Sequence, residues 1–592
     1  MPPGRRGDSL PVSDTEVAMS YILTNAHWFV LLVGALVLFH ELGHFLAAKA
    51  LGVRVLRFSI GMGPRVLGWR HGETEYQLSL LPIGGYVKMW GEPSEPIGET
   101  AGEAAADAGP PEDVDPRRSF SVRPLWQRTT IVLAGPMANF LLAWLVYLGM
   151  FHGVHTVGDA RLGMVSPEGP AAQAGLAPGD RIIAVDGQPV GQWDEVRDAI
   201  AVRPGTELPI TIERAGQRRT LVVTTARHSE QDAFRELQER GRIGVSLQYV
   251  RAVVGVVDPD SPAARAGIRS GERLISVGGA PVHAWHEVRA RLALARAGEP
   301  LTLGVGNEGE GEAVREVKLV PRADTPVGLD PTVFSAGDVP GGYTGLVAKD
   351  SLVAEVEPDT PAAAIGLQAG DRVLAVGVHL DGGGERQRPV HVWALDLSSL
   401  SVDPKAELTL TWQRGSLVMR HALRLAAHRV TDDFKETSTT YVFGARNDPA
   451  ASAMYTASRE TGWAPAAVRS GAQVRDDIMM IGQAVGRLVR GRLPLDAMGG
   501  PIMLFVIAEK SAKQGPTFFF RTLAMISVNI GLMNLLPVPT LDGGHLLFLG
   551  IEAVSRRPPS LRIRETAQAV GLVLIALLML MVFRNDVMRF VF

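Results

Sequence analysis

Long apolar runs stand out against an otherwise mixed pattern of polar and apolar positions. Four runs are almost free of charged residues and long enough to span about 30 Å of hydrocarbon as helices. They extend from Tyr21 to Phe39, Thr129 to Phe151, Thr522 to Leu541 and Ala567 to Phe583. One such run alone could be a buried core helix, but four runs near the two ends favour a membrane protein. We predict about four transmembrane helices, at residues 21–51, 129–151, 518–545 and 566–584.

The first apolar run has some features of a secretory signal. Arg5 and Arg6 precede it, and Ala48-Lys49-Ala50 has the small residues of a cleavage site. Cleavage there would remove a two-histidine motif described below, so we interpret the run as a retained helix. Residues 1–20 are a polar tail, and a natural start at Met19 is an alternative.

Basic residues in the short flanks predict the orientation of the helices. Arginines are frequent near both ends of the loop at 52–128 and again in the loop before the last apolar run, so both loops should be cytoplasmic. The termini and the long region 152–517 would then face outside. The loop at 52–128 also contains an acidic, Ala/Gly/Pro-rich insert near 99–115, which we expect to be disordered.

The outside region contains a threefold repeat. Three copies of Pro-Ala-Ala-x-x-Gly-[Leu/Ile]-x-x-Gly-[Asp/Glu]-Arg begin after Gly169, Ser261 and Thr360, and each is followed by β-rich runs. The pattern resembles PDZ domains of bacterial proteases and implies three of them, at 158–228, 241–322 and 326–428. PDZ grooves bind peptide tails as an added strand. The domains could equally act as a filter over the membrane entrance, and the third copy has a Gly-rich insert at 381–384.

Composition agrees with a membrane protein that contains a large soluble insertion. Hydrophobic residues make up 46% of the 592 residues and mean hydropathy is +0.11, although 20% of the residues are charged. The 59 basic and 62 acidic side chains nearly balance, so no nucleic-acid partner is indicated. The chain has no cysteine, so a metal site must use imidazole and carboxylate ligands.

The first apolar helix ends in a metal-binding pattern. His40-Glu41-Leu42-Gly43-His44 is an HExxH motif, whose two histidines lie one turn apart on the same side of a helix. Both imidazoles can reach one Zn²⁺ ion, and Glu41 lies beside its open coordination position. Ionisable groups inside a membrane helix are costly and are functional candidates by default.

A third ligand is expected because catalytic zinc usually has three protein ligands and a water molecule. The third apolar run leads into Asn534-Leu-Leu-Pro-Val-Pro-Thr-Leu-Asp542-Gly-Gly-His545, where prolines interrupt the helix and glycines allow close backbone approach. The first and third helices run in the same direction, so Asp542 should lie at the depth of the HExxH motif. His545 is a competing ligand, and we prefer Asp542.

The combined motifs resemble the site-2 protease family of intramembrane zinc metalloproteases, in its regulator of sigma-E protease branch. HELGH, GPMANF at 135–140 and LDGGH at 541–545 support this, with PDZ-like repeats between them. The third repeat and the acidic insert depart from the usual pattern. The resemblance implies a polytopic α-helical membrane protein of the inner membrane with one catalytic zinc ion, tandem PDZ domains outside and the active site toward the cytoplasm.

The resemblance also implies how a substrate is cut. Glu41 would be the general base at a zinc ion held by His40, His44 and Asp542. A transmembrane substrate must be unwound, and a membrane-re-entrant β-element at 58–89 would offer it an edge, with Gly61, Gly63, Gly84 and Gly85 at its turns. An ordinary loop turn is the alternative for the glycine pair in this element. The candidate substrate-binding residues are Asn534, Gly84, Gly85 and Tyr86.

Substrates implied by the resemblance are single-span anti-sigma factors already trimmed outside, with remnant signal peptides as a further candidate. A catalytically silent scaffold and a metal transporter are the alternatives. Linker helices are expected at 440–517, where Val474, Ile478 and Ile481 lie on one apolar face. That face could rest on the outer membrane surface or pack against the nearby PDZ unit. Asn139 and Asn529, inside membrane segments, are expected to make hydrogen bonds between helices.

Overall fold

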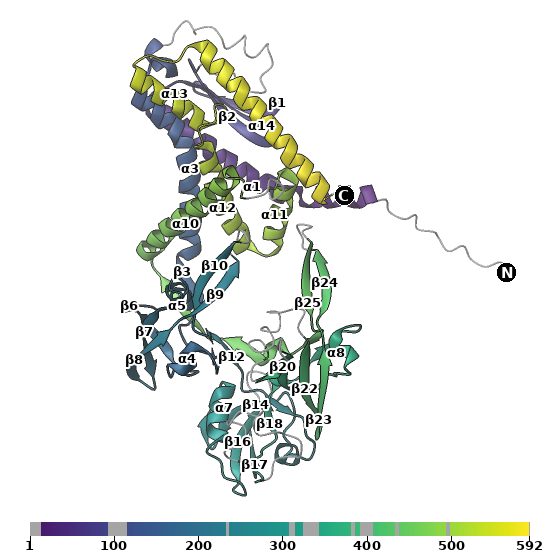
Figure 1. Ribbon diagram of the computed structural model, residues 1–592. Coiled ribbons are helices and arrows are strands. Elements are labelled where there is room, and N and C mark those ends of the chain that lie inside the picture. The colour runs from purple at the N-terminus through teal and green to yellow at the C-terminus, as the bar shows by residue number, and fades with distance from the viewer. Residues whose placement is uncertain are drawn as a thin grey trace, which may run out of the picture. The chain divides into compact units, whose positions relative to one another are not determined.

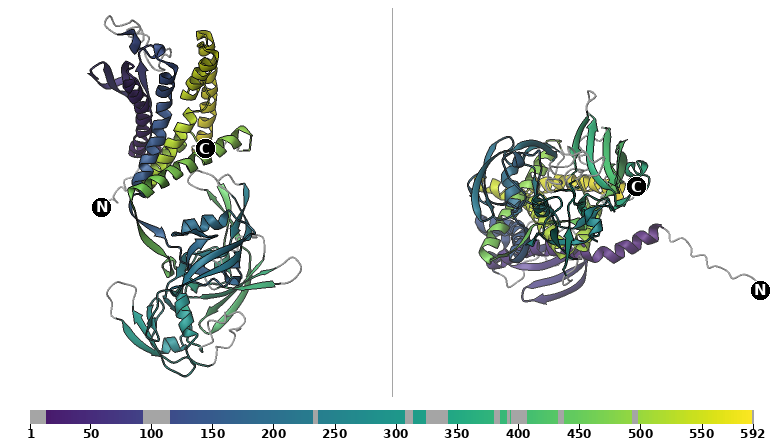
Figure 2. Two further views of the ribbon diagram at one scale, coloured as in Figure 1. Left: turned by 90° about the vertical axis from the view of Figure 1, so that its left-hand side faces the viewer. Right: turned by 90° about the horizontal axis from the view of Figure 1, so that it is seen from below.

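The structure is a computed structural model that describes residues 14–92, 115–231, 236–306, 314–323, 342–379, 385–390, 393, 407–431, 437–492 and 498–590. The chain divides into two compact units, one of residues 1–155 and 460–592 and the other of residues 156–459. Figures 1 and 2 show that the first unit is mainly helical and the second mainly strands. Most of the N-terminal tail, the acidic insert and the Gly-rich insert lie outside the described residues.

The described residues of the first unit form seven α-helices and one β hairpin (Figure 1). Four of the described helices are long and apolar enough to cross a membrane: α1, α3, α12 and α14. These are the four runs expected from the sequence. The helices of the unit are α1 (Asp14–Ala50), α3 (Leu125–Phe151), α10 (Trp463–Val489), α11 (Pro501–Lys513), α12 (Pro516–Asn534), α13 (Asp542–Ser555) and α14 (Leu561–Phe590), and the short 3-10 turns η1 (Pro116–Arg118) and η2 (Phe120–Val122) precede α3.

Close packing joins α3 to its neighbours α1 and α12. A Cβ atom on Gly43 of α1 would lie 2.3 Å from the carbonyl oxygen of Ala134 on α3, so only glycine allows this approach. Ser527 of α12 donates a hydrogen bond of 2.8 Å to the carbonyl of Asn139 on α3. Both contacts lie beside residues of the HELGH and GPMANF motifs, which therefore fix how the helices meet.

The segment expected as one helix at 518–545 is two helices in the structure. Helix α12 ends at Asn534, and α13 begins at Asp542. Pro537 and Pro539 lie in the loop between them. Proline has no backbone N–H group, so these residues cannot donate the hydrogen bonds of a continuous helix. The expectation that prolines interrupt the helix is confirmed, but the LDGGH motif starts a new helix instead of ending the old one.

The hairpin β1 (Val55–His71) and β2 (Thr74–Met89) forms a two-stranded antiparallel sheet. A tight turn lies at Gly72 and Glu73. Residues 57–60 pair both with 75–78 and with 85–88, so the chain also reverses between 60 and 65 and between 79 and 85, as the turns expected at Gly61, Gly63 and Gly84 require. Those three glycines lie inside the strands with φ of +88°, +88° and +79°. The pairing register shifts repeatedly along this stretch, as β-bulges do. Glycine at these positions therefore allows the two long strands to fold back on themselves.

The amphipathic stretch before the third span is helix α10. Its apolar residues Val474, Ile478, Ile481 and Val485 pack in one cluster with residues of α3 and α12. The Tyr147 hydroxyl of α3 donates a 2.6 Å hydrogen bond to the buried Asp477 carboxylate of α10. This face therefore packs on two helices of the first unit, a contact that neither expectation named. The prediction of linker helices at 440–461 was wrong, because this part forms short strands and the 3-10 turn η5 (Pro449–Ala451).

Asp586 of α14 binds the N-terminus of α11. Its carboxylate accepts hydrogen bonds from the backbone N–H groups of Gly500, Ile502 and Met503 at 2.9, 2.8 and 3.1 Å. Pro501, which has no N–H, is the first residue of that helix. Asp586 is 1% exposed, so these groups have little access to water. A carboxylate at a helix N-terminus is also favoured by the helix dipole.

An Asp586→Ala variant should therefore be less stable, by about 2 kcal/mol, because three part-buried N–H groups lose their acceptor. Unfolding in mixed micelles would measure the change. Asp586→Asn keeps one oxygen acceptor and should lose less. Equal stability of the alanine variant and the parent chain would contradict the capping role.

Three successive domains of the second unit have the same strand order. Each has a four-stranded antiparallel sheet, a separate two-stranded pair and its own apolar core. The sheets have the orders β6-β5-β7-β8, β15-β14-β16-β17 and β21-β20-β22-β23, and the pairs are β4–β11, β13–β18 and β19–β26. The threefold repeat in the sequence is thus a threefold repeat in topology.

The bounds of the elements are as follows. The first domain has β4 (Met164–Val165), α4 (Pro170–Gln173), β5 (Arg181–Val185), β6 (Gln188–Pro189), α5 (Trp193–Ala201), β7 (Glu207–Arg214), β8 (Gln217–Thr224), β9 (Ala226–Gln231), β10 (Leu237–Arg242) and β11 (Val245–Ser246). The second has β13 (Val254–Val256), α6 (Pro262–Arg265), β14 (Arg273–Val277), β15 (Ala280–Pro281), α7 (Trp285–Leu292), β16 (Leu301–Gly306), β17 (Arg315–Leu319) and β18 (Leu346–Ala348). The third has β19 (Glu355–Val356), α8 (Pro361–Ala364), β20 (Arg372–His379), β21 (Glu385–Pro389), β22 (Leu408–Arg414), β23 (Leu417–Leu423), β24 (Ala426–Thr431), β25 (Thr437–Val442) and β26 (Ala445–Arg446).

An ion pair closes the repeated turn in all three domains. The acidic residue of each kernel pairs with an arginine from a later strand, and the same arginine donates to the carbonyl of the first kernel glycine. The pairs are Asp180 with Arg214, Glu272 with Arg315 and Asp371 with Arg414. The acidic position of the kernel is therefore explained by local structure in every copy.

The domain boundaries differ from those expected. The last strands β11, β18 and β26 lie beyond the expected ends at 228, 322 and 428. Each of these strands has only two or three residues, which is too short to show an alternating pattern. The additional hairpin β9–β10 in the first domain and β24–β25 in the third separates the sheet from its last strand.

Candidate metal centre

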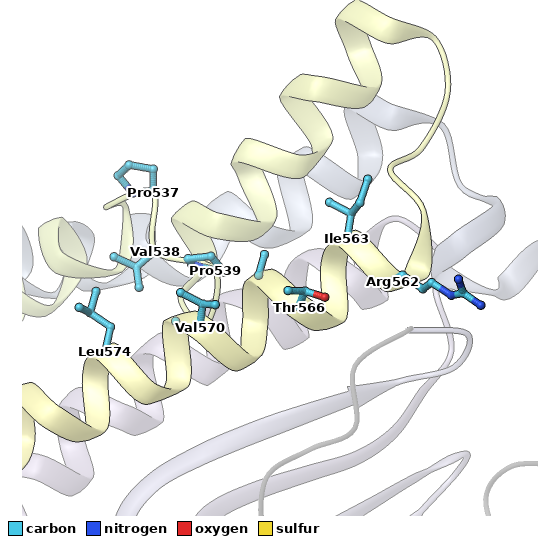
Figure 3. A pocket seen from close by; sticks show the side chains of 10 residues that line it. Pro537, Val538, Pro539, Arg562, Ile563, Thr566, Val570 and Leu574 are labelled. Carbon is cyan, nitrogen blue, oxygen red and sulfur yellow. The ribbon is translucent and has the colours of Figure 1, made fainter.

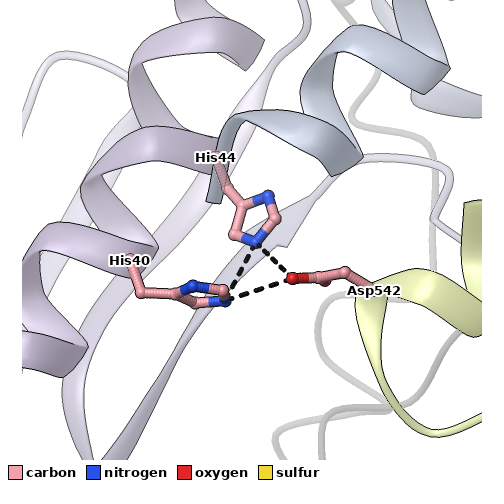
Figure 4. Close-up of side chains that lie close together, drawn as sticks. All are labelled: His40, His44 and Asp542. Carbon is pink, nitrogen blue, oxygen red and sulfur yellow. Dashed lines mark hydrogen bonds and ion pairs between the residues drawn. The ribbon is translucent and has the colours of Figure 1, made fainter. Parts of the chain in front are cut away.

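The residues predicted to bind zinc lie together in the first unit. His40 and His44 come from α1, and Asp542 is the first residue of α13 (Figure 4). The Asp542 Oδ2 atom lies 3.2 Å from His40 Nε2 and 3.5 Å from His44 Nε2, and the two Nε2 atoms are 3.3 Å apart. Their side chains are 12%, 11% and 18% exposed. Two motifs 500 positions apart in the chain thus converge on one buried point.

The spacing of these three atoms fits a tetrahedral zinc ion. Ligands about 2.0–2.1 Å from such an ion lie about 3.3–3.4 Å from one another. In addition, Asp542 Oδ2 is buried and has no hydrogen bond of normal geometry, although both imidazoles are close. A buried, unsatisfied carboxylate oxygen is costly unless a cation or donor reaches it. The donor set therefore fits the metal that the motifs predict.

Helix α3 supports the second histidine. His44 Nδ1 lies 2.9 Å from the carbonyl oxygen of Ile131, which fixes the ring so that Nε2 faces the cluster. Gly135 of the GPMANF motif lies under the same ring, and a Cβ atom there would be 2.1 Å from His44 Nε2. Any larger residue at this position would displace the imidazole.

The loop between α12 and α13 presents Asp542. Its backbone turns tightly, with hydrogen bonds from Val538 to Leu536 and from Leu541 to Val538 at 2.7 and 2.9 Å. A Cβ atom on Gly543 or Gly544 would lie 2.1 or 2.3 Å from a carbonyl oxygen of this loop. The expectation that the two glycines permit close backbone approach is confirmed.

Glu41 lines the same cavity, of about 280 Å³, but is not one of the converging ligands. Gly85 and Tyr86 of β2 line it too, and a Cβ atom on Gly85 would lie 2.9 Å from Glu41 Cγ. Asn534 lies at the end of α12 with its Nδ2 atom 3.3 Å from His40 Nε2. Of the candidate substrate-binding residues, only Gly84 is absent from the described lining and the histidine contacts.

Glu92 and Arg128, which also line this cavity, were not singled out as functional from the sequence. Glu92 follows β2, and burial raises the pKa of its carboxyl to about 7. Arg128 of α3 makes a bidentate pair with Glu552 of α13 at 2.5 and 3.1 Å. His545 lines the cavity but is not part of the three-ligand cluster. No motif marked Glu92 or Glu552, because the surrounding residues have no distinctive spacing.

A second hollow in the first unit, of about 580 Å³, lies between the α12–α13 loop and α14 (Figure 3). Pro537, Val538 and Pro539 form one wall, and Val570 and Leu574 of α14 form the other. The lining is mainly apolar, with Arg562 at one end. The loop that presents Asp542 therefore has the metal cluster near its C-terminal end and an apolar groove beside its prolines.

Comparison with known proteins gives the family. The model of peptidase family M50 matches residues 28–578. The chain belongs to this family. A regulator of sigma-E protease RseP from Salmonella typhimurium (strain 14028s / SGSC 2262) is 28% identical, covering 96% of this chain and 100% of its own length. The RseP of Escherichia coli K12 is also 28% identical, over 95% and 98% of the two chains. A protein of Neisseria meningitidis serogroup A named as a zinc metalloprotease is 26% identical over 95% and 98%.

This M50 peptidase is thus a membrane zinc metalloprotease of the site-2 protease family, as the motifs indicated. A PDZ domain protein from Parabacteroides distasonis matches half of the chain at 11% identity, but its TM-score of 0.12 is too low to support a shared fold. The repeated domains are therefore characterised by their own strand order alone.

Proposed function

We propose that this M50 peptidase cuts peptide bonds within or beside the transmembrane helix of single-span membrane proteins, as the second step of regulated proteolysis. The observation that supports this most directly is the position of the ligand cluster. His40 and His44 lie in a helix apolar enough to cross a membrane, and Asp542 begins the helix after another such helix. A bilayer substrate can reach this depth, whereas most soluble chains cannot.

The proposed chemistry uses the residues of the cavity. His40, His44 and Asp542 hold one zinc ion, which when bound lowers the pKa of water and polarises the scissile carbonyl. Glu41, which lies beside this cluster without joining it, accepts the water proton and passes it to the leaving amine. Asn534 donates its amide to the substrate backbone.

The substrate must be extended before it is cut, because a helix hides its carbonyls in its own hydrogen bonds. Among the described residues of the β1–β2 sheet, residues 57–60 pair on both sides, whereas 85–88 pair only with 57–60. The other edge of 85–88 therefore carries backbone groups that can accept an added strand. Gly85 and Tyr86 of β2 lie in the wall of the catalytic cavity, and Gly84 precedes them. We assign substrate holding to these three residues, with the hairpin re-entrant at the cytoplasmic side.

We assign the three repeated domains to the PDZ class, on the extracytoplasmic side of the inner membrane. Their short helices start at a proline after the residues Gly169, Ser261 and Thr360, and the same carboxylate–arginine pair follows in each. Tail binding and screening of bulky substrates are both consistent with such domains. Substrates of the anti-sigma factor type, and remnant signal peptides, have the single span that this arrangement requires.

Cleavage in proteoliposomes tests the proposal. The purified chain should cut a reporter with one transmembrane helix inside or beside that helix, as mapped by mass spectrometry. The same peptide sequence placed in a soluble, folded carrier should remain intact, and a zinc chelator should stop the reaction.

Two results would contradict the proposed function. Equal cleavage of the soluble carrier would show that the membrane is not required. Zinc flux into the vesicles without any proteolysis would instead support the metal-transporter alternative.

A further inference from the structure

One buried amide contacts the metal centre without being a ligand. Asn139 of α3 is 0% exposed, and its Nδ2 atom lies 3.2 Å from His40 Nδ1. Its Oδ1 atom is buried and has no hydrogen-bond partner among the described residues. Asn139 was expected to make a hydrogen bond between helices, and its contact with His40 does join α3 to α1. The partner is the ring of a proposed zinc ligand, so the contact bears on the metal site.

The position of the proton on the His40 ring decides whether Oδ1 or Nδ2 of Asn139 can face His40 Nδ1. A neutral imidazole has one N–H group, and a nitrogen that binds a metal must present its lone pair. His40 Nε2 faces His44 and Asp542. When zinc binds at this atom, the ring proton must be on Nδ1. An N–H group of the amide would then oppose an N–H group of the ring.

Rotation of the amide by 180° about its Cβ–Cγ bond removes this conflict. It exchanges Nδ2 and Oδ1 at almost no cost in packing, because the two ends have nearly the same size. The oxygen then accepts a hydrogen bond from His40 Nδ1. The far end of the amide is without a partner as placed, so the bond to His40 decides the orientation.

The second histidine has the equivalent support. His44 Nδ1 lies 2.9 Å from the Ile131 carbonyl, eight residues before Asn139 on the same helix. Helix α3 thus lies along α1 and faces both imidazoles, with a backbone oxygen at one and a side-chain amide at the other. Partners of this kind fix the tautomer and orientation of metal-binding histidines.

We propose that Asn139 is a positioning residue of the zinc site, which accepts a hydrogen bond from His40 Nδ1–H through its side-chain oxygen. This inference rests on the proposed assignment of His40, His44 and Asp542 as ligands. Asn139 does not touch the metal or the substrate. It holds the His40 ring in the tautomer that presents Nε2 to the ion.

Zinc affinity of the full chain in detergent, measured by competition with a chromogenic chelator, tests the proposal. Asn139→Leu has a similar volume and no acceptor, so zinc should bind about 10–100-fold more weakly. Asn139→Asp keeps an oxygen at the same place but has no N–H donor. It should bind zinc at least as tightly as the parent chain.

The aspartate variant makes the test independent of the leucine variant's folding. A carboxylate that restores affinity identifies acceptance as the role. If Asn139→Asp loses more than about tenfold in affinity, the amide acts as a donor or as packing, and the proposal fails. Unchanged affinity of a folded Asn139→Leu protein would overturn it as well.

Ser527→Ala is the matched control for packing. It removes the hydrogen bond to the Asn139 backbone carbonyl, 2.8 Å long, and leaves the side-chain amide in place. Its zinc affinity should stay within about twofold of the parent value, and a loss like that of Asn139→Leu would count against a specific role. Asp542→Ala tests the ligand assignment separately from the role of Asn139. If this variant keeps its zinc, the ligand assignment itself has failed.

Discussion

A Glu41→Gln variant is expected to bind zinc like the parent chain and to cleave a single-span reporter about 10²–10⁴-fold more slowly. Glu41 lines the catalytic cavity but is not one of the three converging ligands, so the metal site should survive. Glutamine has nearly the same shape as glutamate and cannot accept the proton of the attacking water. Zinc content by elemental analysis and single-turnover cleavage in proteoliposomes measure the two effects separately.

Glu565→Gln is the matched control for that experiment. Glu565 lines the same cavity from α14 and is exposed, so the substitution changes the cavity charge by the same amount. It should cleave the reporter at close to the parent rate. Similar losses in the two variants would indicate a general effect of charge, and unchanged cleavage by Glu41→Gln would sink the mechanism.

The metal centre was predictable because each half of it is marked locally. The helical period places His40 and His44 on one side of α1, and the order of the apolar runs predicts the same direction for α1 and α12. Asp542 therefore had to lie near the histidines, although the loop between α12 and α13 was expected to belong to one helix. The ligand distances depend on helix packing that only the structure provides.

The parts that sequence reasoning missed are set by long-range contacts. Strands β11, β18 and β26 are too short to show a pattern, and they exist because a partner strand far away pairs with them. The apolar face of α10 fits a membrane surface as well as it fits α3 and α12. Asn139 was placed between helices, but nothing in the sequence identifies His40 as its neighbour. Contacts between distant segments therefore could not be predicted from the sequence, whereas the residues of the local motifs could.

An Asp542→Ala variant is expected to bind zinc more than about 100-fold more weakly. Removing a partner that only orients a ligand already lowers metal affinity about 10–100-fold, and Asp542 is a proposed ligand itself. The two imidazoles would remain 3.3 Å apart without the carboxylate that completes the set. Chelator competition in detergent measures the affinity, and cleavage of the reporter should fall with zinc content. Excess zinc should restore part of the activity, because the histidines and Glu41 are unchanged.

His545→Ala decides between the two candidate third ligands. His545 is on the same helix as Asp542 and lines the same cavity, but it lies outside the cluster of converging atoms. The His545→Ala variant should therefore keep its zinc. If His545→Ala loses the metal and Asp542→Ala retains it, the ligand assignment must be reversed. Loss in both variants would indicate that the N-terminal turn of α13 unfolds, which circular dichroism and protease resistance of the two purified proteins would distinguish from loss of a single ligand.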